Sequence, residues 1–383
     1  MVKSTDQKVR KRANGEGSMY EAADGRWHGA ITWTDPAGIR HRKTFASRLR
    51  GTVKDRMDTF RRDLDRDDGI VPKGTLGEYL TGWLVTARQD IRPATWRHRD
   101  NMVRTHIVPS VGTVKLAKLT PADVERMTAG MVSAGKSPTT AIGARVILRR
   151  ALADAQRDGK VRQNAAALAR PPRKVRHELV YLDAAQLRRL LDATTGHVLG
   201  PLIAVAATTG LRQGELLGLR WQDVDTGGAS LTVRRSMALA WDGTYQLAEP
   251  KTKGSRRTIN LPARAVAALT EQQARQERAK QAAGTAWQDR DRLVFTDGAG
   301  IALRGDIVTH EYQKQLRAIG LPVVPFHALR HSMASALLAA GVPLKVVSET
   351  LGHASIAITA DVYAHVSPEL RKDAADAMDR ALG

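Results

Sequence analysis

The chain has 383 residues, no cysteine, and 60 lysines and arginines against 39 aspartates and glutamates, a formal net charge of +21. This length predicts two or three domains, and the lack of cysteine excludes disulfides, thiol catalysis and cysteine-ligated metal sites. The sequence holds no run of 18 apolar residues, so it predicts no membrane span, and its charged N-terminus is unlike a secretory signal. We therefore expect a cytoplasmic protein with an anionic partner and no membrane contact.

Residues 1–72 predict a small sheet-plus-helix module. Three short strands are expected between residues 17 and 45, separated by turns at 23–26 and 35–38. A helix is predicted over residues 46–68, because apolar side chains recur there at helical spacing: Leu49, Val53, Met57 and Phe60. The module could be a minor folding appendage, but its basic character favours DNA binding.

The middle of the chain, residues 73–176, predicts a basic helical domain. It holds 20 basic and 7 acidic side chains, a net charge of +13, against +5 for residues 1–72 and +3 for residues 177–383. Such a concentration favours nucleic acid over a solvated surface, and the absence of a basic amphipathic surface helix argues against membrane docking. The low aromatic content of 4% is unlike proteins that stack single-stranded bases. Helices are expected at 75–88, 93–108 (closed by Pro109), 120–135 and 137–159.

A basic linker at 171–178 leads to a mostly helical C-terminal part. Its strands are expected within 229–236 and 245–261. Its helices are predicted at 182–194, 197–210, 262–283, 305–320, 327–341 and 343–352, and a further helix is predicted to start within 211–225. A final amphipathic helix over 367–383, with Ser367 as its cap, could dock on its own domain or on a neighbouring protomer.

The chain lacks the common nucleotide and metal motifs. It contains no G-x-G-x-x-G, no G-x-x-x-x-G-K-[ST] and no H-E-x-x-H, and its acidic residues are scattered. We therefore expect no cofactor and no metal, and any reaction on DNA should proceed without a metal ion.

Four short stretches carry residues suited to chemistry on an anion. Arg212 and Glu215 lie three apart after a glycine turn, and His327 and Arg330 lie three apart on one predicted helix face. His353 follows a glycine between two helices, and Tyr363 lies ten residues later. Each alone has a plainer interpretation, as a surface ion pair, a helix cap or a packing residue.

Taken in chain order, these residues resemble the tyrosine recombinase family of phage and mobile-element integrases, whose pattern is R, K, H-x-x-R, H or W, and Y. The words TTGLRQGEL, PKTKGSRRTI, FHALRHS, LGHASI and VYAH carry the resemblance over residues 178–366. Residues 74–170 resemble the family's helical core-site-binding domain, and residues 15–66 its arm-type DNA-binding domain. The resemblance implies a mainly α fold with small β-sheets (α+β). Its domains would be an arm-binding domain at 1–72, a core-binding domain at 73–170 and a mixed α/β catalytic domain at 178–383.

The resemblance also implies a chemistry that suits these side chains. The enzyme would cleave and rejoin duplex DNA through a 3′-phosphotyrosine intermediate, integrating or excising a mobile element. Guanidinium groups bind phosphate oxygens in forked pairs, and histidine transfers protons near neutral pH. The implied catalytic residues are Arg212, Lys251, His327, Arg330, His353 and Tyr363, with Glu215 orienting Arg212 or His327.

Two lysines compete for one role in the K-T-K-G segment. The family's P-K-T wording favours Lys251 over Lys253 as the catalytic lysine. Lys253 would then contact the DNA backbone, together with Arg256 and Arg257. Further DNA contacts are expected from the basic residues Arg97, Arg99, Arg104, Arg145, Arg149, Arg173 and Lys174.

The implied partners are double-stranded DNA attachment sites and further copies of the chain. A tetramer on DNA would exchange the C-terminal helix between protomers, and a host factor and a directionality factor would join it. Two alternatives remain open at this point: a type IB topoisomerase-like monomer, and a catalytically inactive DNA-binding regulator.

Overall fold

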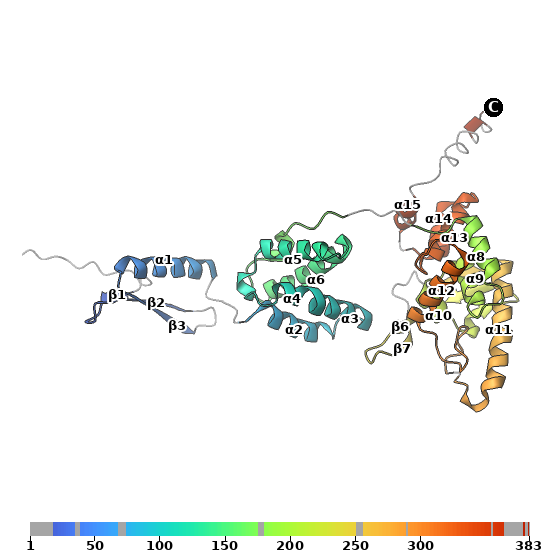
Figure 1. The fold of residues 1–383 in the computed structure, drawn as a ribbon, viewed down its shortest axis with the longest axis horizontal. Coiled ribbons are helices and arrows are strands. Elements are labelled where there is room, and N and C mark those ends of the chain that lie inside the picture. Colours follow the sequence, from blue (N-terminus) through green and yellow to red (C-terminus); the bar gives the residue numbers. More distant parts are fainter. Residues whose placement is uncertain are drawn as a thin grey trace, which may run out of the picture. The chain divides into compact units, whose positions relative to one another are not determined.

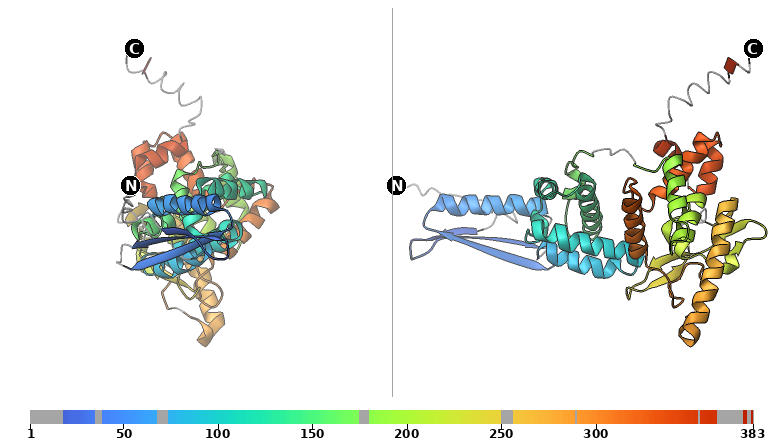
Figure 2. Two further views of the ribbon diagram at one scale, coloured as in Figure 1. Left: turned by 90° about the vertical axis from the view of Figure 1, so that its left-hand side faces the viewer. Right: turned by 45° about the vertical axis from the view of Figure 1, so that its right-hand side comes forward.

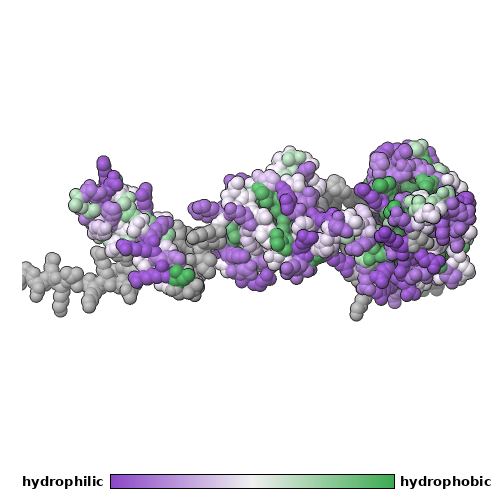
Figure 3. Space-filling model, turned by 90° about the horizontal axis from the view of Figure 1, so that it is seen from below, coloured by the Kyte–Doolittle hydropathy of each residue, from purple (hydrophilic) through white to green (hydrophobic). Residues whose placement is uncertain are grey.

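The computed structural model describes residues 18–34, 39–67, 74–174, 180–249, 256–288, 290–353, 355–363, 378–379 and 382, and it divides into two compact units, residues 1–176 and 177–383. None of the helices in these ranges combines the length and hydrophobicity that crossing a lipid bilayer requires. Figure 3 shows a face on which most of the surface is hydrophilic and hydrophobic groups form short strips.

The first unit begins with the predicted three-stranded antiparallel sheet. Its strands β1 (Ser18–Glu21), β2 (Trp27–Thr34) and β3 (Arg40–Ser47) pair in the order β1-β2-β3. Helix α1 (Arg50–Asp67) lies across one face of the sheet (Figures 1 and 2), where buried Ile31 packs with two residues of the helix, Val53 and Met57. The helix begins later than predicted, so Leu49 precedes it and is 69% exposed instead of joining the buried stripe. The predicted turn at 35–38 lies outside the described residues.

The rest of the first unit is a helical module. Its helices are α2 (Leu76–Ala87), α3 (Pro93–Met102), α4 (Val108–Val111), α5 (Pro121–Ser133), α6 (Pro138–Arg157) and the unpredicted α7 (Ala165–Leu168). Thr75 and Thr120 begin α2 and α5 with capping boxes, and Ser137 caps α6, which fits the preference of short hydroxyl side chains for these positions. One hydrophobic core joins all the longer helices, with Leu80, Ile107, Met127, Leu148 and Leu152 fully buried.

Pro109 does not end its helix as predicted. A π-helical turn, Val103–Ile107, joins α3 to α4, and the Val108 N–H donates to the carbonyl of Val103. Proline cannot donate a backbone hydrogen bond and crowds the preceding turn, and a π-turn is a known way to absorb such a misfit. The chain therefore stays helical to Val111, past the proline.

The second unit is helical around two small sheets, which confirms the predicted α+β class. Helices α8 (Ala184–Ala193) and α9 (Gly200–Thr209) precede α10 (Gln213–Leu217), after which the 3-10 turn Trp221–Asp223 leads into strands. The helix predicted to start within 211–225 is α10, which is five residues long because Gly218, a poor helix former, follows it. The three-stranded sheet joins β4 (Val224–Asp225), β5 (Ser230–Val233) and β8 (Arg257–Asn260), and β6 (Ser236–Leu239) pairs with β7 (Tyr245–Ala248).

The remaining helices complete the core and reach the site. They are α11 (Ala263–Ala283), the 3-10 turn Gly284–Ala286, α12 (Gly305–Ile319), α13 (Ala328–Ala339), α14 (Leu344–Leu351) and α15 (Ile356–Tyr363). The long α11 packs along α9 (Figure 1), and buried Leu202, Ile203, Phe295 and Tyr312 lie in the shared core. Of the predicted C-terminal helix, only residues 378–379 and 382 lie within the described ranges, where Met378 and Leu382 are exposed.

Candidate active site

Arg212 begins α10 and is held by the residue three positions later. Gly210 ends α9 in the left-handed conformation (φ +63°), which glycine adopts without strain, and this turn leads into Arg212. The Glu215 carboxylate accepts the Arg212 backbone N–H (3.0 Å) and its Nη1 (2.9 Å). The Arg212 side chain remains 38% exposed, whereas that of Glu215 is 3% exposed. The guanidinium is therefore oriented and still accessible to an anion.

Arg257, at the start of β8, shares the same carboxylate. Its Nη2 lies 3.0 Å from Oε2 of Glu215 and its Nη1 lies 3.3 Å from Oε1. Burial acts to raise the pKa of Glu215, but the hydrogen bonds and charge of Arg257, joined by those of Arg212, outweigh it and hold the pKa below its ordinary value. The Arg257 side chain is only 8% exposed. All three nitrogens of its guanidinium donate within the protein, to Glu215 and to the Thr350 carbonyl, so the prediction that Arg257 contacts the DNA backbone is corrected.

Arg330 is almost entirely buried, with 2% of its surface exposed. His327 is the N-terminal cap residue of α13, and Arg330 lies within the first turn. The Arg330 Nη1 donates to the Gly210 carbonyl (2.7 Å) and its Nη2 to the Leu351 carbonyl (2.6 Å). These bonds tie α13 to the ends of α9 and α14.

Three arginines converge on the C-terminal end of α14. The carbonyls of Thr350, Leu351 and Gly352 accept in turn from Arg257 Nε (2.9 Å), Arg330 Nη2 (2.6 Å) and Arg212 Nη2 (3.4 Å). Carbonyls at the end of a helix lack intrahelical partners and carry partial negative charge, so cations are favoured there. The site therefore joins α10, β8, α13 and α14 through one helix end.

His353 follows this helix end directly. Gly352 has φ +66°, which turns the chain from α14 toward α15, and the His353 Nδ1 lies 2.7 Å from the Thr359 hydroxyl. Burial and then the charges of Arg330 and Arg212 lower the pKa of His353 to about 4. The ring is therefore neutral at pH 7.

His327 stacks edge-on against His331, with ring centroids 5.1 Å apart. Burial, then His331, Arg330 and Arg212, lower the pKa of His327 to about 4. His327 as a residue remains exposed to solvent, so burial lowers its pKa less than it would in a core. The charges of the neighbouring cations lower the pKa as well. His327 is thus a neutral imidazole at the edge of the arginine cluster.

Two predicted catalytic residues, Lys251 and Tyr363, and the alternative lysine Lys253 lie wholly or partly outside the described residues. Lys251 and Lys253 lie outside the described residues. Tyr363 is the last residue of α15, and its side chain is also outside the described part. The structure therefore brings together Arg212, Glu215, His327, Arg330 and His353.

The arrangement suits a phosphate group. Among the described residues named here, Arg212 and Arg257 pair with the Glu215 carboxylate, and Arg330 joins the cluster through the Leu351 carbonyl. Three guanidinium groups and one carboxylate give the cluster excess positive charge for an anion. In the described ranges no group of three or more histidine, cysteine, aspartate or glutamate side chains is placed to hold a metal ion.

The residues predicted to contact DNA outside this cluster differ in exposure. The prediction that Arg145 contacts DNA is corrected, because this residue is only 9% exposed. Its Nη2 donates to the carbonyls of Ala167 and Ala169 and so fastens α7 to α6. Arg97 and Arg99 are half-buried, and Arg99 lies over the Trp83 ring at 5.6 Å. The remaining predicted residues are exposed at the surface: Arg104, Arg149, Arg173, Lys174 and Arg256.

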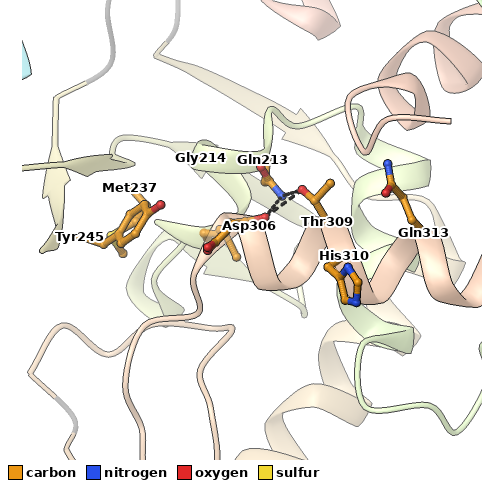
Figure 4. A pocket seen from close by; sticks show the side chains of 10 residues that line it. Gln213, Gly214, Met237, Tyr245, Asp306, Thr309, His310 and Gln313 are labelled. Carbon is orange, nitrogen blue, oxygen red and sulfur yellow. Dashed lines mark hydrogen bonds between the residues drawn. The ribbon is translucent and has the colours of Figure 1, made fainter. Parts of the chain in front are cut away.

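A pocket of about 570 Å³ is lined by Gln213, the residue that follows Arg212 in the chain (Figure 4). The Gln213 Nε2 donates to the Gly305 carbonyl and to the Thr309 hydroxyl, both at 2.9 Å, and so joins α10 to α12. Met237 and Tyr245 line the pocket on one side of Gln213, and His310 and Gln313 of α12 line it on the other. Its lining fixes the start of α10, where Arg212 is held.

Sequence reasoning missed the roles of His331, Thr359 and Arg257 in building this cluster. His331 had a usable signal, because the word H-A-L-R-H places two histidines one helical turn apart. Thr359 and Arg257 had none, since their partners come from other elements of the fold.

The chain matches known families and proteins along most of its length. Residues 180–369 match the phage integrase family, and residues 75–131 match the phage integrase N-terminal SAM-like domain. A tyrosine recombinase XerC-like protein of Caldanaerobacter subterraneus subsp. tengcongensis is 32% identical over 323 residues, which cover 80% of this chain and 83% of that protein. An integrase of Streptomyces ambofaciens is 29% identical over 364 residues, covering 93% of each chain.

Solved structures share the fold. The Tn1549 transposon integrase in complex with a circular intermediate DNA superposes with a TM-score of 0.68 at 20% identity, covering 81% of this chain and all of that one. A lambda integrase dimer bound to a core site gives a TM-score of 0.57 at 18% identity, covering 92% of this chain and 96% of that one. With the identity and coverage of the bacterial relatives, these findings confirm the resemblance, and the chain belongs to the phage integrase family as a tyrosine-type site-specific recombinase.

Proposed function

We propose that the chain cleaves and rejoins duplex DNA at attachment sites through a 3′-phosphotyrosine at Tyr363, and thereby integrates or excises a mobile element. The observation that carries this proposal is the convergence of Arg212, Arg330 and His353 on the turn that leads into α15, the helix ending at Tyr363. Family membership supports the reaction class.

The arginines would bind and polarise the phosphodiester. Charge grows on the two non-bridging oxygens during attack, and preorganised guanidinium groups stabilise it without reorganising. Arg212 is already oriented by Glu215, and Arg330 by two backbone carbonyls. When its Nδ1 accepts from the Thr359 hydroxyl, His353 carries its proton on Nε2 and can donate it to a phosphate oxygen.

His327 would take the proton of the attacking phenol. Its neutral state at pH 7 leaves a ring nitrogen free to accept, and a bound phosphodiester would raise its pKa toward neutrality. The Tyr363 oxygen bonds to phosphorus, the bond from phosphorus to the 5′ oxygen breaks, and a lysine protonates that oxygen. We assign this lysine to Lys251, with Lys253 as the alternative. The phosphotyrosine retains the bond energy, so rejoining consumes no ATP.

We propose three domains for gripping DNA: an arm-binding domain at 1–72, a core-binding domain at 73–170 and the catalytic domain at 178–383. In the N-terminal sheet, residues that alternate with buried Ile31 face away from α1. Apart from Ala30 and Ala46, they are polar, aromatic or basic and include Tyr20, His28, Thr32, Arg40 and Arg42. The core-binding domain would contribute Arg97, Arg99, Arg104, Arg149, Arg173 and Lys174, and the catalytic domain Arg256.

The proposed partners are DNA and further copies of the chain. A lambda integrase tetramer bound to a Holliday junction shares this fold and supports a tetramer as the working assembly. Exchange of the helix at 367–383 between protomers, a host factor and a directionality factor belong to the proposal, and DNA as substrate makes the cytoplasm the expected compartment.

A covalent adduct tests the proposal. The purified chain is mixed with a nicked duplex carrying an attachment site recovered from the circular junction of the element, and products are separated on a denaturing gel. We expect a protein–DNA adduct with the native chain and none with Tyr363→Phe. Absence of any adduct would instead indicate an inactive DNA-binding regulator. Relaxed circles without strand exchange between two sites would indicate a topoisomerase.

A further inference from the structure

Arg257 occupies a central position in the cluster although its side chain is almost fully buried. It is the first residue of β8, it bonds both oxygens of Glu215, and it donates to the Thr350 carbonyl. It also packs on the turn before His353, because a Cβ added at Gly352 would lie 2.9 Å from its Cδ. Arg257 therefore contacts both the residue that orients Arg212 and the turn that carries His353.

We propose that Arg257 is a positioning residue for strand cleavage, which sets Arg212 through Glu215 and sets His353 through the end of α14. The inference rests on the proposed function. All three of its guanidinium nitrogens donate to Glu215 or to the Thr350 carbonyl, so it acts through other residues and is distinct from the arginines proposed to bind phosphate.

Charge sharing gives the first part of this role its physical basis. Glu215 carries one negative charge and accepts from two guanidinium groups. With Arg257 in place, the carboxylate is balanced by a buried cation, so the charge of Arg212 stays available for a phosphodiester. Without Arg257, Glu215 would pair with Arg212 alone and neutralise the group that should bind the anion.

The C-terminal end of α14 gives the physical basis for the second part of the role, the positioning of His353. Arg257 and Arg330 hold the adjacent carbonyls of Thr350 and Leu351, and Arg212 reaches that of Gly352. Loss of Arg257 would leave the partly buried Thr350 carbonyl without this donor and loosen the turn that fixes His353. Displacements of about 1 Å in such supporting contacts can slow a reaction about 100-fold.

The test compares Arg257→Ala and Arg257→Lys with the control Arg264→Met in the full chain. Arg264 is exposed and pairs with Asp192 at the surface, so the control removes a cation from the catalytic unit without touching Glu215. Three quantities are measured: the rate of adduct formation at saturating protein, DNA affinity by gel shift, and the thermal midpoint. A fourth arm adds methylguanidinium, or methylammonium at equal concentration, to Arg257→Ala.

We expect Arg257→Ala to form adduct about 10- to 100-fold more slowly while its DNA affinity changes little. Methylguanidinium should restore part of the rate and methylammonium should not, because only the planar fork can bond the two Glu215 oxygens. Arg257→Lys keeps the charge and should stay folded but slow, and Arg264→Met should cleave at the native rate.

Three results would overturn the inference. The first is cleavage by Arg257→Ala within about threefold of native, which is the scale of a neutral surface change. The second is a slow rate that methylguanidinium does not improve, or that tracks a loss of DNA affinity. The third is unfolding of both Arg257 variants, which would make the arginine a folding residue. A native chain that forms no adduct would refute the proposed function itself, a separate outcome.

Discussion

Glu215→Gln replaces the buried carboxylate of the site with an amide of nearly equal size. The side chain is 3% exposed, and it accepts from Arg212 and from Arg257, whose side chain is 8% exposed. The substitution therefore leaves a guanidinium group buried without its counter-charge. Removing one partner of a buried pair costs about 3–5 kcal/mol, and we expect the lower end, about 3 kcal/mol, because Arg212 can still reach water.

A calorimetric scan of the free chain measures this cost. For a domain of about 200 residues, each kcal/mol shifts the melting midpoint by about 2–4 °C, so the transition of the catalytic unit should fall by about 6–12 °C. Adduct formation below that temperature should also slow, because the amide cannot orient Arg212 by charge. The matched control is Glu249→Gln, whose carboxylate is 66% exposed and pairs with Arg256, and it should change stability by less than about 0.5 kcal/mol.

The reasoning would be refuted if Glu215→Gln melted within about 2 °C of the native chain, on the same scale, and cleaved at the native rate. An equal loss in both variants would also contradict it, because burial would then not explain the difference between the two pairs.

Three further predictions concern two matched pairs of residues and the two histidines of the site. Arg145→Met should destabilise the helical module by about 1–3 kcal/mol, measured by urea titration, because it removes the donor to two carbonyls. Arg149→Met should leave stability unchanged and reduce the salt dependence of DNA binding, measured by gel shifts at several salt concentrations. Gly352→Ala should slow adduct formation because its Cβ would meet Arg257, whereas Gly341→Ala, also at positive φ but facing open space, should cost only stability of about 1–2 kcal/mol and cleave normally. The pKa values of His327 and His353 are lowered from 6.5 to about 4, so the unfolded chain takes up protons first, and stability should fall as pH drops from about 6.5 toward 4. When both histidines are replaced by glutamine, the melting midpoint should depend less on pH across this range. An equal dependence on pH would count against the lowered pKa values.

Local patterns predicted the elements well where the signal lies in neighbouring residues. Thr120 and Pro121 begin α5 as capping chemistry requires, and the alternation around Ile31 gives the N-terminal sheet. The sequence motifs around Arg212, His327 and His353 predicted which elements carry these residues, and the fold brings the ends of those elements together.

The remaining features depend on partners far away in the chain. Nothing local distinguishes Arg145 and Arg257, which are buried, from Arg149 and Arg256, which are exposed. Their burial is decided by carbonyls and a carboxylate on other elements, as with the Arg257 partners Glu215 and Thr350. A proline signal alone also could not predict the π-turn that carries the helix through Pro109.

The central claim is that Tyr363 forms the covalent bond to DNA, and mapping the DNA-linked peptide tests it most directly. The chain has six tyrosines, so five serve as internal controls in one experiment. The account predicts a peptide containing Tyr363 joined to a 3′-phosphate, together with a released 5′-hydroxyl end. Attachment through any other residue, or through a 5′-phosphate, would contradict it.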